Sequence, residues 1–502
     1  MNQNIADKQK EYFYSMLSDE ERDLLHYLPT VADLLKFAAK EYAHLPAISD
    51  GESITDYEQL EKRVAVRRGY LKSLGLKKGD RIAVYSQNTV EAMELYLAIT
   101  TGGYVSLMLP AALDSNTLFA LCKKFKISHL FYDKTLADNI PDGISSCSTE
   151  FVVASLGEYA NLKKEDICSI CLTGGTTGTP KGAVLTHGAI MRGAFNGCFI
   201  PGGVLYQKYI AILPFSHIFG LVKGFLSCLY TGGQVVECRD IKRAFAEIPV
   251  HKPTTLILVP GMAEIIVGLS KKMGKNYCSS LKTVVTGAAP VSPKLMKELD
   301  ALGINVLAGY GLTEGANLSA GNKAVLENPD SMGMIYPEQQ FKTVDGELLL
   351  KGDNLMLGYF EDEEATKAAF DEDGWLKTGD LAKFDENGNI YIVGRIKNLI
   401  ILDNGENVSP EEIEEIFDRE EMIKDCLVKE DKIGERTVIA IEILPDYLVT
   451  GEMSDEAASS AFSEVVSRIN KTLPDYKKVS KFTVRKEDFK RTGAMKIARN
   501  QE

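Results

Sequence analysis

The feature that most constrains the fold of this chain is an alternation of apolar, strand-like runs with helix-like segments over its first four-fifths. Residues 81–87 (RIAVYSQ) predict a strand, and residues 89–103 predict a helix that ends at a glycine. Further strand-like runs lie at residues 209–215, 254–260, 281–290 and 304–311, with a helical segment at residues 293–303. This alternation is typical of parallel sheets whose faces are covered by helices.

The pattern changes from about residue 346. Residues 346–352 and 375–395 predict short strands joined by Gly and Asn-Gly turns. The last hundred residues or so predict a strand at residues 398–408, a helix at residues 409–420 that opens with an S-x-x-E capping box at Ser409, and a strand at residues 437–445. We therefore expect an α/β fold. Residues 1–396 form a large N-terminal domain of parallel sheets wrapped by helices with a β-rich subdomain, and residues 397–502 form a small, mobile α+β domain.

Length and composition narrow the function. A chain of 502 residues is too long to fold around one hydrophobic core, so we expect at least two domains. Its net charge of -13 disfavours nucleic acids and anionic membranes as partners. The most apolar long window, residues 209–230, is interrupted by Pro214, His217 and Lys223, and it is too polar to span a membrane. The N-terminus is polar and predicts no targeting segment, and nine scattered cysteines indicate reduced thiols. We expect a cytoplasmic protein.

The loop LTGGTTGTPKG at residues 172–182 has the composition of a phosphate-binding loop. Its glycines let backbone N–H groups approach a ligand, its threonines add hydroxyl donors, and Lys181 adds a positive charge. It is not a P-loop of the G-x-x-x-x-G-K-[ST] type, because Lys181 follows Pro180 and precedes Gly182. A flexible linker is the alternative, and the apolar strand directly before the loop argues against it.

The loop resembles the phosphate-binding signature of the adenylate-forming enzymes, which include acyl-CoA synthetases, luciferases and peptide-synthetase adenylation domains. The resemblance spans nearly the whole chain, because five more motifs of that family follow in the family's order. They are VTGAAP (285–290), GYGLTE (309–314), WLKTGDLA (375–382), GRIKNLIILDNGENVSPEEIE (394–414) and KRTGAMKIA (490–498). GYGLTE is a weak signal alone, but six motifs in the family's order are a specific one.

The resemblance implies a set of residues that bind ATP. Those that match the phosphate loop are Thr173, Gly174, Gly175, Thr176, Thr177, Gly178, Thr179 and Lys181. Those that match the adenine-binding elements are Gly287, Ala288, Ala289, Gly309, Tyr310 and Gly311. Tyr310 would stack on the base, and a core tyrosine is the alternative. Most of the family has serine at the position of Gly174, so one hydroxyl is absent here.

The resemblance also assigns the residues around the reacting groups. Thr313 would contact the α-phosphate, and Glu314 would hold magnesium together with Thr176. Asp380 would accept both ribose hydroxyls, supported by Arg395, although an aspartate in a turn is the bland alternative.

The C-terminal motifs imply a moving domain. Lys496 would bind the attacking carboxylate and the α-phosphate, Lys397 matches the hinge, and Gly405 matches the glycine past which the pantetheine arm runs. For Lys496 and Lys397 the alternative is an exposed lysine. Met495 replaces a common glycine next to Lys496.

His217, in LPFSHIFG, resembles the element beside the acyl pocket, and a core histidine is the competing interpretation. No acidic residue accompanies Phe215 and Ser216, and this disfavours an α-amino acid because its ammonium would lack a partner.

The function implied is that of an AMP-forming acid–CoA ligase in fatty acid metabolism. It would use ATP, magnesium and coenzyme A to activate an apolar carboxylic acid of the fatty type. An enzyme that loads a carrier protein's phosphopantetheine is one alternative. A catalytically inactive nucleotide-binding scaffold is another, disfavoured because five charged motif residues are present.

Overall fold

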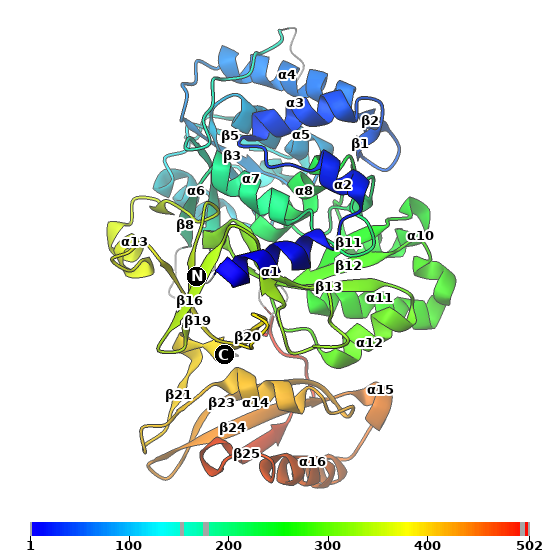
Figure 1. Ribbon diagram of the computed structural model, residues 1–502, viewed down its shortest axis with the longest axis vertical. Helices are drawn as coiled ribbons and strands as arrows, with labels where there is room; N and C mark the ends of the chain where they lie inside the picture. Colours follow the sequence, from blue (N-terminus) through cyan, green and yellow to red (C-terminus); the bar gives the residue numbers. More distant parts are fainter. Residues whose placement is uncertain (1–2, 151–154, 174–179, 492–496, 500–502) are drawn as a thin grey trace.

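The computed structural model describes residues 3–150, 155–173, 180–491 and 497–499. A seven-stranded sheet with the order β18-β8-β7-β4-β3-β5-β6 occupies the upper part of the molecule (Figure 1). Its strands are β3 (Arg81–Tyr85), β4 (Val105–Leu109), β5 (His129–Tyr132), β6 (Ser146–Ser148), β7 (Ile167–Thr173), β8 (Lys181–Thr186) and β18 (Gly358–Tyr359). Strands β3 to β7 run parallel, whereas β8 and β18 are antiparallel additions. The helices associated with this sheet are α3 (Val31–Glu41), α4 (Tyr57–Ser73), α5 (Val90–Thr101), α6 (Ser115–Lys124) and α7 (His187–Asn196).

A five-stranded sheet lies beside the first and carries the adenine motif. Its strands are β11 (Thr255–Leu258), β12 (Thr283–Gly287), β13 (Asn305–Leu312), β14 (Asn317–Asn322) and β15 (Met334–Ile335). The first three are parallel and the last two are antiparallel. Helices α11 (Pro260–Met273) and α12 (Pro293–Ala301) connect the parallel strands, as the sequence predicts. The predicted α/β class is therefore confirmed, with parallel strands at the centre of both sheets.

A smaller mixed sheet closes the N-terminal part, in the order β2-β1-β10-β9. Its strands are β1 (Pro46–Ser49), β2 (Ile54–Asp56), β9 (Lys208–Ile210) and β10 (Gln234–Val236). Strand β9 is shorter than the predicted strand at residues 209–215. A π-helix, η2 (Phe219–Leu226), and a short helix, α8 (Ser227–Tyr230), follow that segment.

The predicted β-rich subdomain is an antiparallel sheet with the order β16-β17-β19-β20. Its strands are β16 (Gln340–Val344), β17 (Glu347–Lys351), β19 (Leu376–Phe384) and β20 (Ile390–Arg395). Asp345 and Gly346 join β16 to β17, both with positive φ (51° and 83°), which suits a tight hairpin turn. Helix α13 (Glu363–Ala369) precedes β19.

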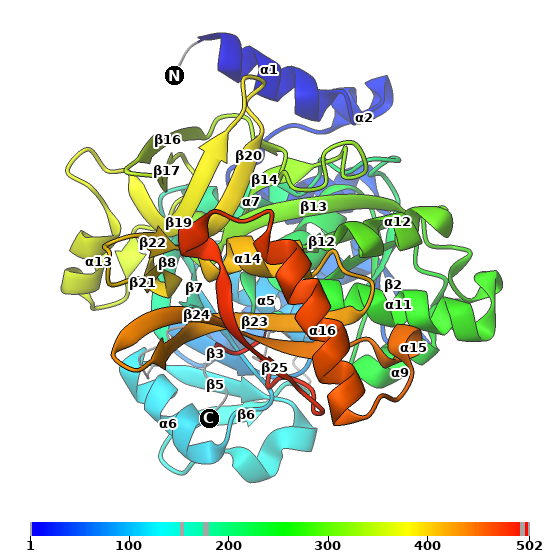
Figure 2. The same ribbon diagram turned by 90° about the horizontal axis from the view of Figure 1, so that it is seen from below.

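The C-terminal segment has its own core and lies below the larger part in Figure 1. A three-stranded sheet of β23 (Ile423–Ile433), β24 (Arg436–Pro445) and β25 (Val479–Val484) packs against α14 (Pro410–Phe417) and α16 (Asp455–Asn470), which Figure 2 shows from below. The predicted strand at residues 398–408 is instead a hairpin of β21 (Ile400–Ile401) and β22 (Asn407–Val408). The Asn-Gly pair that interrupts the run forms its turn.

The predicted capping box at Ser409 is wrong. Ser409 does precede α14, but its side chain caps no backbone N–H group of the helix. Its hydroxyl donates instead to the Glu411 carboxylate (2.9 Å), and the box glutamate, Glu412, pairs with Lys477. Because the Glu412 carboxylate binds Lys477, it does not accept a hydrogen bond from the backbone at the start of α14.

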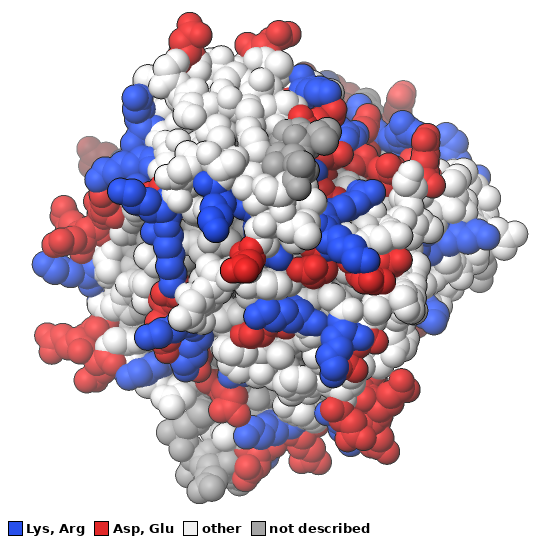
Figure 3. Space-filling model, turned by 90° about the horizontal axis from the view of Figure 1, so that it is seen from above, with Lys and Arg blue, Asp and Glu red and all other residues white. Residues whose placement is uncertain are grey.

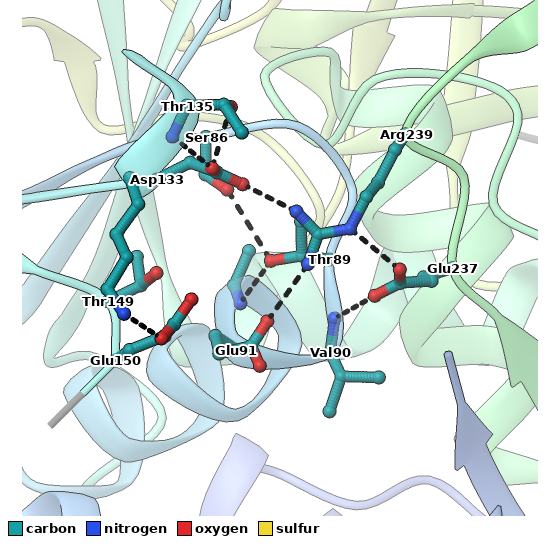
Figure 4. Close-up of polar contacts among 12 residues, drawn as sticks. Ser86, Thr89, Val90, Glu91, Asp133, Thr135, Thr149, Glu150, Glu237 and Arg239 are labelled. Carbon is teal, nitrogen blue, oxygen red and sulfur yellow. Dashed lines mark hydrogen bonds and ion pairs between the residues drawn. The ribbon is translucent and has the colours of Figure 1, made fainter. Parts of the chain in front are cut away.

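Arg239 ties two sheets together at the carboxyl ends of β3 and β5 (Figure 4). Its guanidinium contacts the carboxylates of Asp133 (3.0 Å), Glu237 (2.8 Å) and Glu91 (3.6 Å). Ligands of open α/β sheets often bind at the carboxyl ends of neighbouring strands that lead to opposite faces. Here this position is occupied by an internal ion-pair network, which joins β10 to the larger sheet.

The surface carries both signs of charge. Lys and Arg side chains alternate with Asp and Glu over the face seen from above (Figure 3). Within the described residues, no helix has the length and apolar character needed to cross a membrane.

Candidate active site

One cluster of the candidate site joins three strands around a buried carboxylate. The Tyr310 hydroxyl donates to Asp380 Oδ2 (2.7 Å), and Arg395 Nε lies 2.7 Å from Asp380 Oδ1. Tyr310 comes from β13, Asp380 from β19 and Arg395 from the end of β20, and Asp380 pairs with Arg395 across the sheet. Asp380 is only 2% exposed. Burial, followed by the Asp380 charge, raises the pKa of Tyr310 well above its usual value, so its hydroxyl stays protonated and keeps donating.

The backbone beside Tyr310 is shaped for close approach. Gly287, at the carboxyl end of β12, pairs with Gly309 of β13, and a Cβ on Gly287 would lie 2.8 Å from the Gly309 carbonyl oxygen. A Cβ on Gly311 would lie 2.1 Å from the Asn317 carbonyl oxygen. Ala288 has φ of +68°, an uncommon conformation for a residue with a side chain. The predicted adenine residues Gly287, Ala288, Gly309 and Gly311 thus lie together at one end of the sheet, where neighbouring backbone leaves no room for larger side chains at Gly287 and Gly311.

A second cluster joins the phosphate loop to the acidic residue predicted to hold magnesium. The Tyr359 hydroxyl donates to Glu314 Oε1 (2.7 Å), and the Lys181 ammonium lies 4.9 Å from the centre of the Tyr359 ring. Lys181 opens β8, and Glu314 lies in a short 3₁₀ turn, η4 (Thr313–Gly315), directly after β13. Because Tyr310 and Glu314 are four residues apart on this continuous segment, the two clusters form one site.

The structure describes the two ends of the phosphate loop. Thr173 ends β7 opposite Lys181, and its hydroxyl donates to the Lys181 carbonyl oxygen (3.5 Å). The predicted loop residues between them, 174–179, lie outside the described residues, as does the predicted catalytic lysine, Lys496.

The chemistry of Glu314 suits magnesium. Its carboxylate is half-buried and offers the hard oxygen ligand that this ion prefers, and Thr176, its predicted companion, lies outside the described residues. Among the residues that are described, no three His, Cys, Asp or Glu side chains gather into a metal-binding group. A single carboxylate, that of Glu314, suits Mg²⁺ bound together with ATP, because the phosphates of the nucleotide would supply most of the other oxygen ligands.

His217 is exposed, so the alternative of a buried core histidine is wrong. It lies between buried Ser216 and the start of η2, and the protein atoms packed around it lower its pKa. The neutral imidazole therefore predominates at pH 7. A Cβ on Gly287 would lie 3.6 Å from the Phe219 ring, so η2 borders the adenine end of β12.

The C-terminal motif residues lie in two turns. Lys397 is exposed in a 3₁₀ turn, η5 (Ile396–Asn398), directly after Arg395, and burial of its ammonium, with the Arg395 charge second, lowers its pKa. Gly405 turns the β21–β22 hairpin with φ of +82°, and a Cβ there would have no neighbour within 4 Å. Asp403 accepts a hydrogen bond from the Thr437 backbone (3.1 Å), so the hairpin packs on its own domain.

Sequence reasoning missed Tyr359. It lies in MLGYF, a stretch with no charged group, and forms a two-residue strand, β18, that the sequence pattern does not reveal. The glycine before it, Gly358, has φ of +152°, and a glycine next to an aromatic residue was the available signal.

Comparison with known proteins agrees with this geometry. Residues 35–360 match the model of the AMP-binding enzyme family, and residues 397–502 match the AMP-binding enzyme C-terminal domain. The chain is 28% identical to a 2-succinylbenzoate–CoA ligase of Listeria monocytogenes over 455 residues, 89% of this chain and 93% of the relative. It is 29% identical over 453 residues to a long-chain-fatty-acid–CoA ligase of Salmonella typhimurium, 77% of this chain and 80% of the relative. Its fold resembles that of o-succinylbenzoate CoA synthetase (MenE) from Bacillus subtilis, with a TM-score of 0.77, 23% identity, and coverage of 95% of this chain and 98% of that one.

The fold, the site and these matches define an AMP-forming acid–thiol ligase. The chain belongs to the AMP-binding enzyme family. ATP, magnesium and coenzyme A are the substrates and metal of this class of enzyme, as predicted.

Proposed function

We propose that this ligase activates an apolar carboxylic acid of the fatty type with ATP and transfers the acyl group to coenzyme A in the cytoplasm. The observation that carries this proposal is the pair of clusters around Asp380 and Glu314, joined by one segment at the end of β13. All nine cysteines are free thiols, which suits a reducing compartment.

In the first half-reaction, an oxygen of the acid's carboxylate attacks the α-phosphorus of ATP. The bond from that phosphorus to the bridging oxygen breaks, giving an acyl-adenylate and pyrophosphate. Both reactants are anionic, so the protein's main task is to neutralise charge and fix geometry. Asp380 and Tyr310 would hold the nucleoside, Lys181 the outer phosphates, and Lys496 the carboxylate against the α-phosphate.

Magnesium, when bound, supplies further positive charge to the phosphates. Glu314 and Thr176 are the residues that would hold it, and Thr313 would contact the α-phosphate. In the second half-reaction the thiolate of coenzyme A attacks the acyl carbonyl carbon, and AMP leaves.

The surroundings of His217 support an apolar acid. The segment from Leu213 to Leu226 has the sequence LPFSHIFGLVKGFL, which contains no carboxylate for a substrate ammonium. Within this segment the ring centres of Phe215 and Phe225 lie 5.4 Å apart. The relatives act on different acids, 2-succinylbenzoate in one case and long-chain fatty acids in another. The acid of this enzyme is therefore inferred from its own residues.

A cavity beside the Gly405 hairpin supports coenzyme A over a carrier protein. It has a volume of about 410 Å³, and Asn404, Arg436, Tyr476 and Lys478 are among the residues that line it. Asp403 and Asp475 also line the cavity, and Lys478 pairs with Asp475 (2.5 Å). Arg436, the Tyr476 ring and Lys478 are the groups that would contact the phosphorylated nucleotide of coenzyme A, which a carrier protein's phosphopantetheine lacks.

The test of the acid is carboxylate-dependent ATP–pyrophosphate exchange without any thiol, over fatty, aryl, bile-type, dicarboxylic and amino acids. Exchange with fatty acids supports the proposal, and exchange with another class alone replaces the acid. ATP binding without exchange over the whole panel would favour the inactive scaffold.

The test of the acceptor compares coenzyme A with pantetheine, which has the same thiol and no nucleotide. Exchanging Arg436 and Lys478 for Met should raise the KM for coenzyme A at least fivefold and leave that for pantetheine unchanged. Equal effects on both thiols would contradict the role of the cavity, and transfer only to a carrier protein would replace coenzyme A.

A further inference from the structure

Tyr359 lies where the two phosphate-facing segments of the site meet. It pairs with Ala183 of β8, two residues after Lys181. Backbone hydrogen bonds on either side fix this register, from Leu357 to the Val184 carbonyl (2.9 Å) and from Phe360 to the Gly182 carbonyl (2.8 Å). The position of the tyrosine relative to Lys181 is therefore set by the sheet.

The same short segment also fixes Glu314. The Tyr359 hydroxyl donates to Glu314 Oε1 (2.7 Å), and the Met356 backbone N–H donates to the Glu314 carbonyl oxygen (2.8 Å). The side chain and the backbone of Glu314 are thus both held from residues 356–359.

The ring of Tyr359 supports Lys181. The ammonium lies 4.9 Å from the ring centre, within the range of a cation–π contact. The two charged side chains therefore contact the same tyrosine, Lys181 at the ring face and Glu314 at the hydroxyl. Among the residues that the structure describes, however, neither Lys181 nor Glu314 forms an ion pair within 4.0 Å.

We propose that Tyr359 is a positioning residue that keeps Lys181 and Glu314 apart and oriented before the nucleotide binds. The hydroxyl occupies one oxygen of Glu314, and the ring face offers Lys181 an alternative to the carboxylate. Both charged groups then remain open, one to the outer phosphates and the other to their metal ion. Without Tyr359 the two would collapse into an ion pair that ATP and metal must break.

This inference rests on the adenylation half-reaction and is independent of the acid and the thiol. Its test is therefore metal binding to the enzyme–ATP complex without acid or thiol. Mn²⁺, which reports binding through its electron paramagnetic resonance signal, is titrated into full-length enzyme saturated with ATP. We expect Tyr359→Phe, which keeps the ring, to raise the Mn²⁺ dissociation constant about tenfold, the size of a lost hydrogen bond to a charged group. Tyr359→Leu should in addition raise the dissociation constant of ATP.

Tyr310→Phe is the matched control, because it also removes a 2.7 Å hydroxyl–carboxylate bond, but at Asp380. It should weaken ATP binding and leave Mn²⁺ affinity within twofold. A second comparison guards against a general loss of structure: in a Glu314→Gln background, Tyr359→Phe should cause no further loss of Mn²⁺ affinity. Unchanged Mn²⁺ affinity in Tyr359→Phe, or fully additive losses in the double variant, would overturn the proposal. A wrong acid or acceptor would leave all these measurements intact.

Discussion

Tyr310 and Asp380 lie 70 residues apart in the chain, and a single 2.7 Å hydrogen bond joins them between two different sheets. The bond fixes the carboxylate predicted to hold the ribose to the tyrosine predicted to stack on the base. Arg395 binds the other carboxylate oxygen and ends the strand that leads into the C-terminal domain. One buried carboxylate thus connects the adenine side of the site, the ribose side and the start of the domain linker.

Replacing Asp380 by Asn should therefore weaken nucleotide binding selectively. The amide keeps the shape, but it removes the charge from Arg395 and one acceptor site from the ribose. We expect the KM for ATP to rise about 10- to 100-fold, because hydrogen bonds to charged groups contribute about 1.5–3 kcal/mol each. The KM for the acid should change less than threefold, and initial-rate kinetics of pyrophosphate exchange measures both constants. An unchanged KM for ATP would exclude Asp380 from the nucleotide site.

Much of this site follows from the sequence, because its residues lie in local motifs. The resemblance assigned Gly287, Gly309 and Tyr310 to one nucleotide-binding element, and the structure places them together at the carboxyl ends of β12 and β13. The contact of Tyr310 with Asp380 could not be predicted, since it depends on how the antiparallel subdomain packs against the parallel sheet. The role of Tyr359 could not be predicted for the same reason, because its two-residue strand forms only by pairing with β8.

The C-terminal errors also have a physical cause. The capping box at Ser409 is a local pattern, and the salt bridge between Glu412 and Lys477 is a long-range one that overrides it. The strand predicted at residues 398–408 begins with an apolar run, but the polar residues 403–407 that follow, with their Asn-Gly pair, turn the chain back into a hairpin. Local rules fail here where a partner distant in sequence offers a charged group a better contact.

Lys223 should make the stability of the protein depend on alkaline pH. Its side chain is fully buried (0% exposed), and its ammonium donates to the Gly197 carbonyl at the end of α7. Burial lowers its pKa from 10.5 to about 8. At this one position the unfolded chain therefore binds more protons than the folded chain between about pH 8 and pH 10.5. The Lys223 contribution to the free energy of unfolding should rise with pH across this window, opposite in sign to the contribution of the buried cysteines, whose thiol pKa values are raised by burial.

Lys223→Met should remove this pH dependence. It should also stabilise the protein at pH 7 by an amount on the order of 2–3 kcal/mol, reduced by the lost hydrogen bond. Urea denaturation at several pH values measures both effects. Lys72→Met, at an exposed position on α4, is the control and should leave the slope with pH unaltered. The difference in unfolding free energy between the wild type and Lys223→Met isolates the lysine, and a difference that stays constant from pH 8 to pH 10 would contradict the buried charge.

The Arg239 junction should be important for stability and not for chemistry. Arg239→Met leaves Asp133 and Glu237, both buried, without their counter-ion. We expect a loss of about 1–3 kcal/mol, because the carboxylates are desolvated but the Arg239 side chain is 44% exposed and its charge is partly screened. Burial already raises the pKa of Glu237, and without Arg239 it should rise further, so the deficit should shrink as the pH falls and the carboxylates protonate.

Arg243→Met is the matched control for that variant. Arg243 pairs with Glu247 one helical turn away on an exposed surface, so its loss should change the unfolding free energy by less than about 0.5 kcal/mol. Equal destabilisation by the two substitutions would show that the junction at Arg239 is no stronger than a surface pair. Chemical denaturation of both variants in parallel decides between these results.

The arrangement of the two parts of the molecule should favour adenylation over thioester formation. Arg419 contacts Asp330 (2.9 Å) and Lys294 contacts Asp446 (3.2 Å) across the boundary between them. Desolvation by the surrounding protein raises the pKa of Glu264 on α11, and the charge of Asp425 from the C-terminal part adds to this effect. The C-terminal part thus lies against the carboxyl end of the five-stranded sheet, whereas Gly405 lies in a hairpin that packs on its own domain.

Reversing both basic partners, in Arg419→Glu with Lys294→Glu, should release this arrangement. Both pairs are largely exposed, so we expect only a two- to fivefold fall in pyrophosphate exchange relative to thioester formation from preformed acyl-adenylate. High salt should produce the same shift in the wild type, because it screens exposed charges. Lys496→Ala gives the reference, since a lysine that serves adenylation alone should lower exchange by about 10²–10³ and spare the second half-reaction. Equal losses in both half-reactions for Lys496→Ala would rule out a domain that moves between them, and an unchanged ratio in the charge-reversed variant would mean that these two pairs do not hold it.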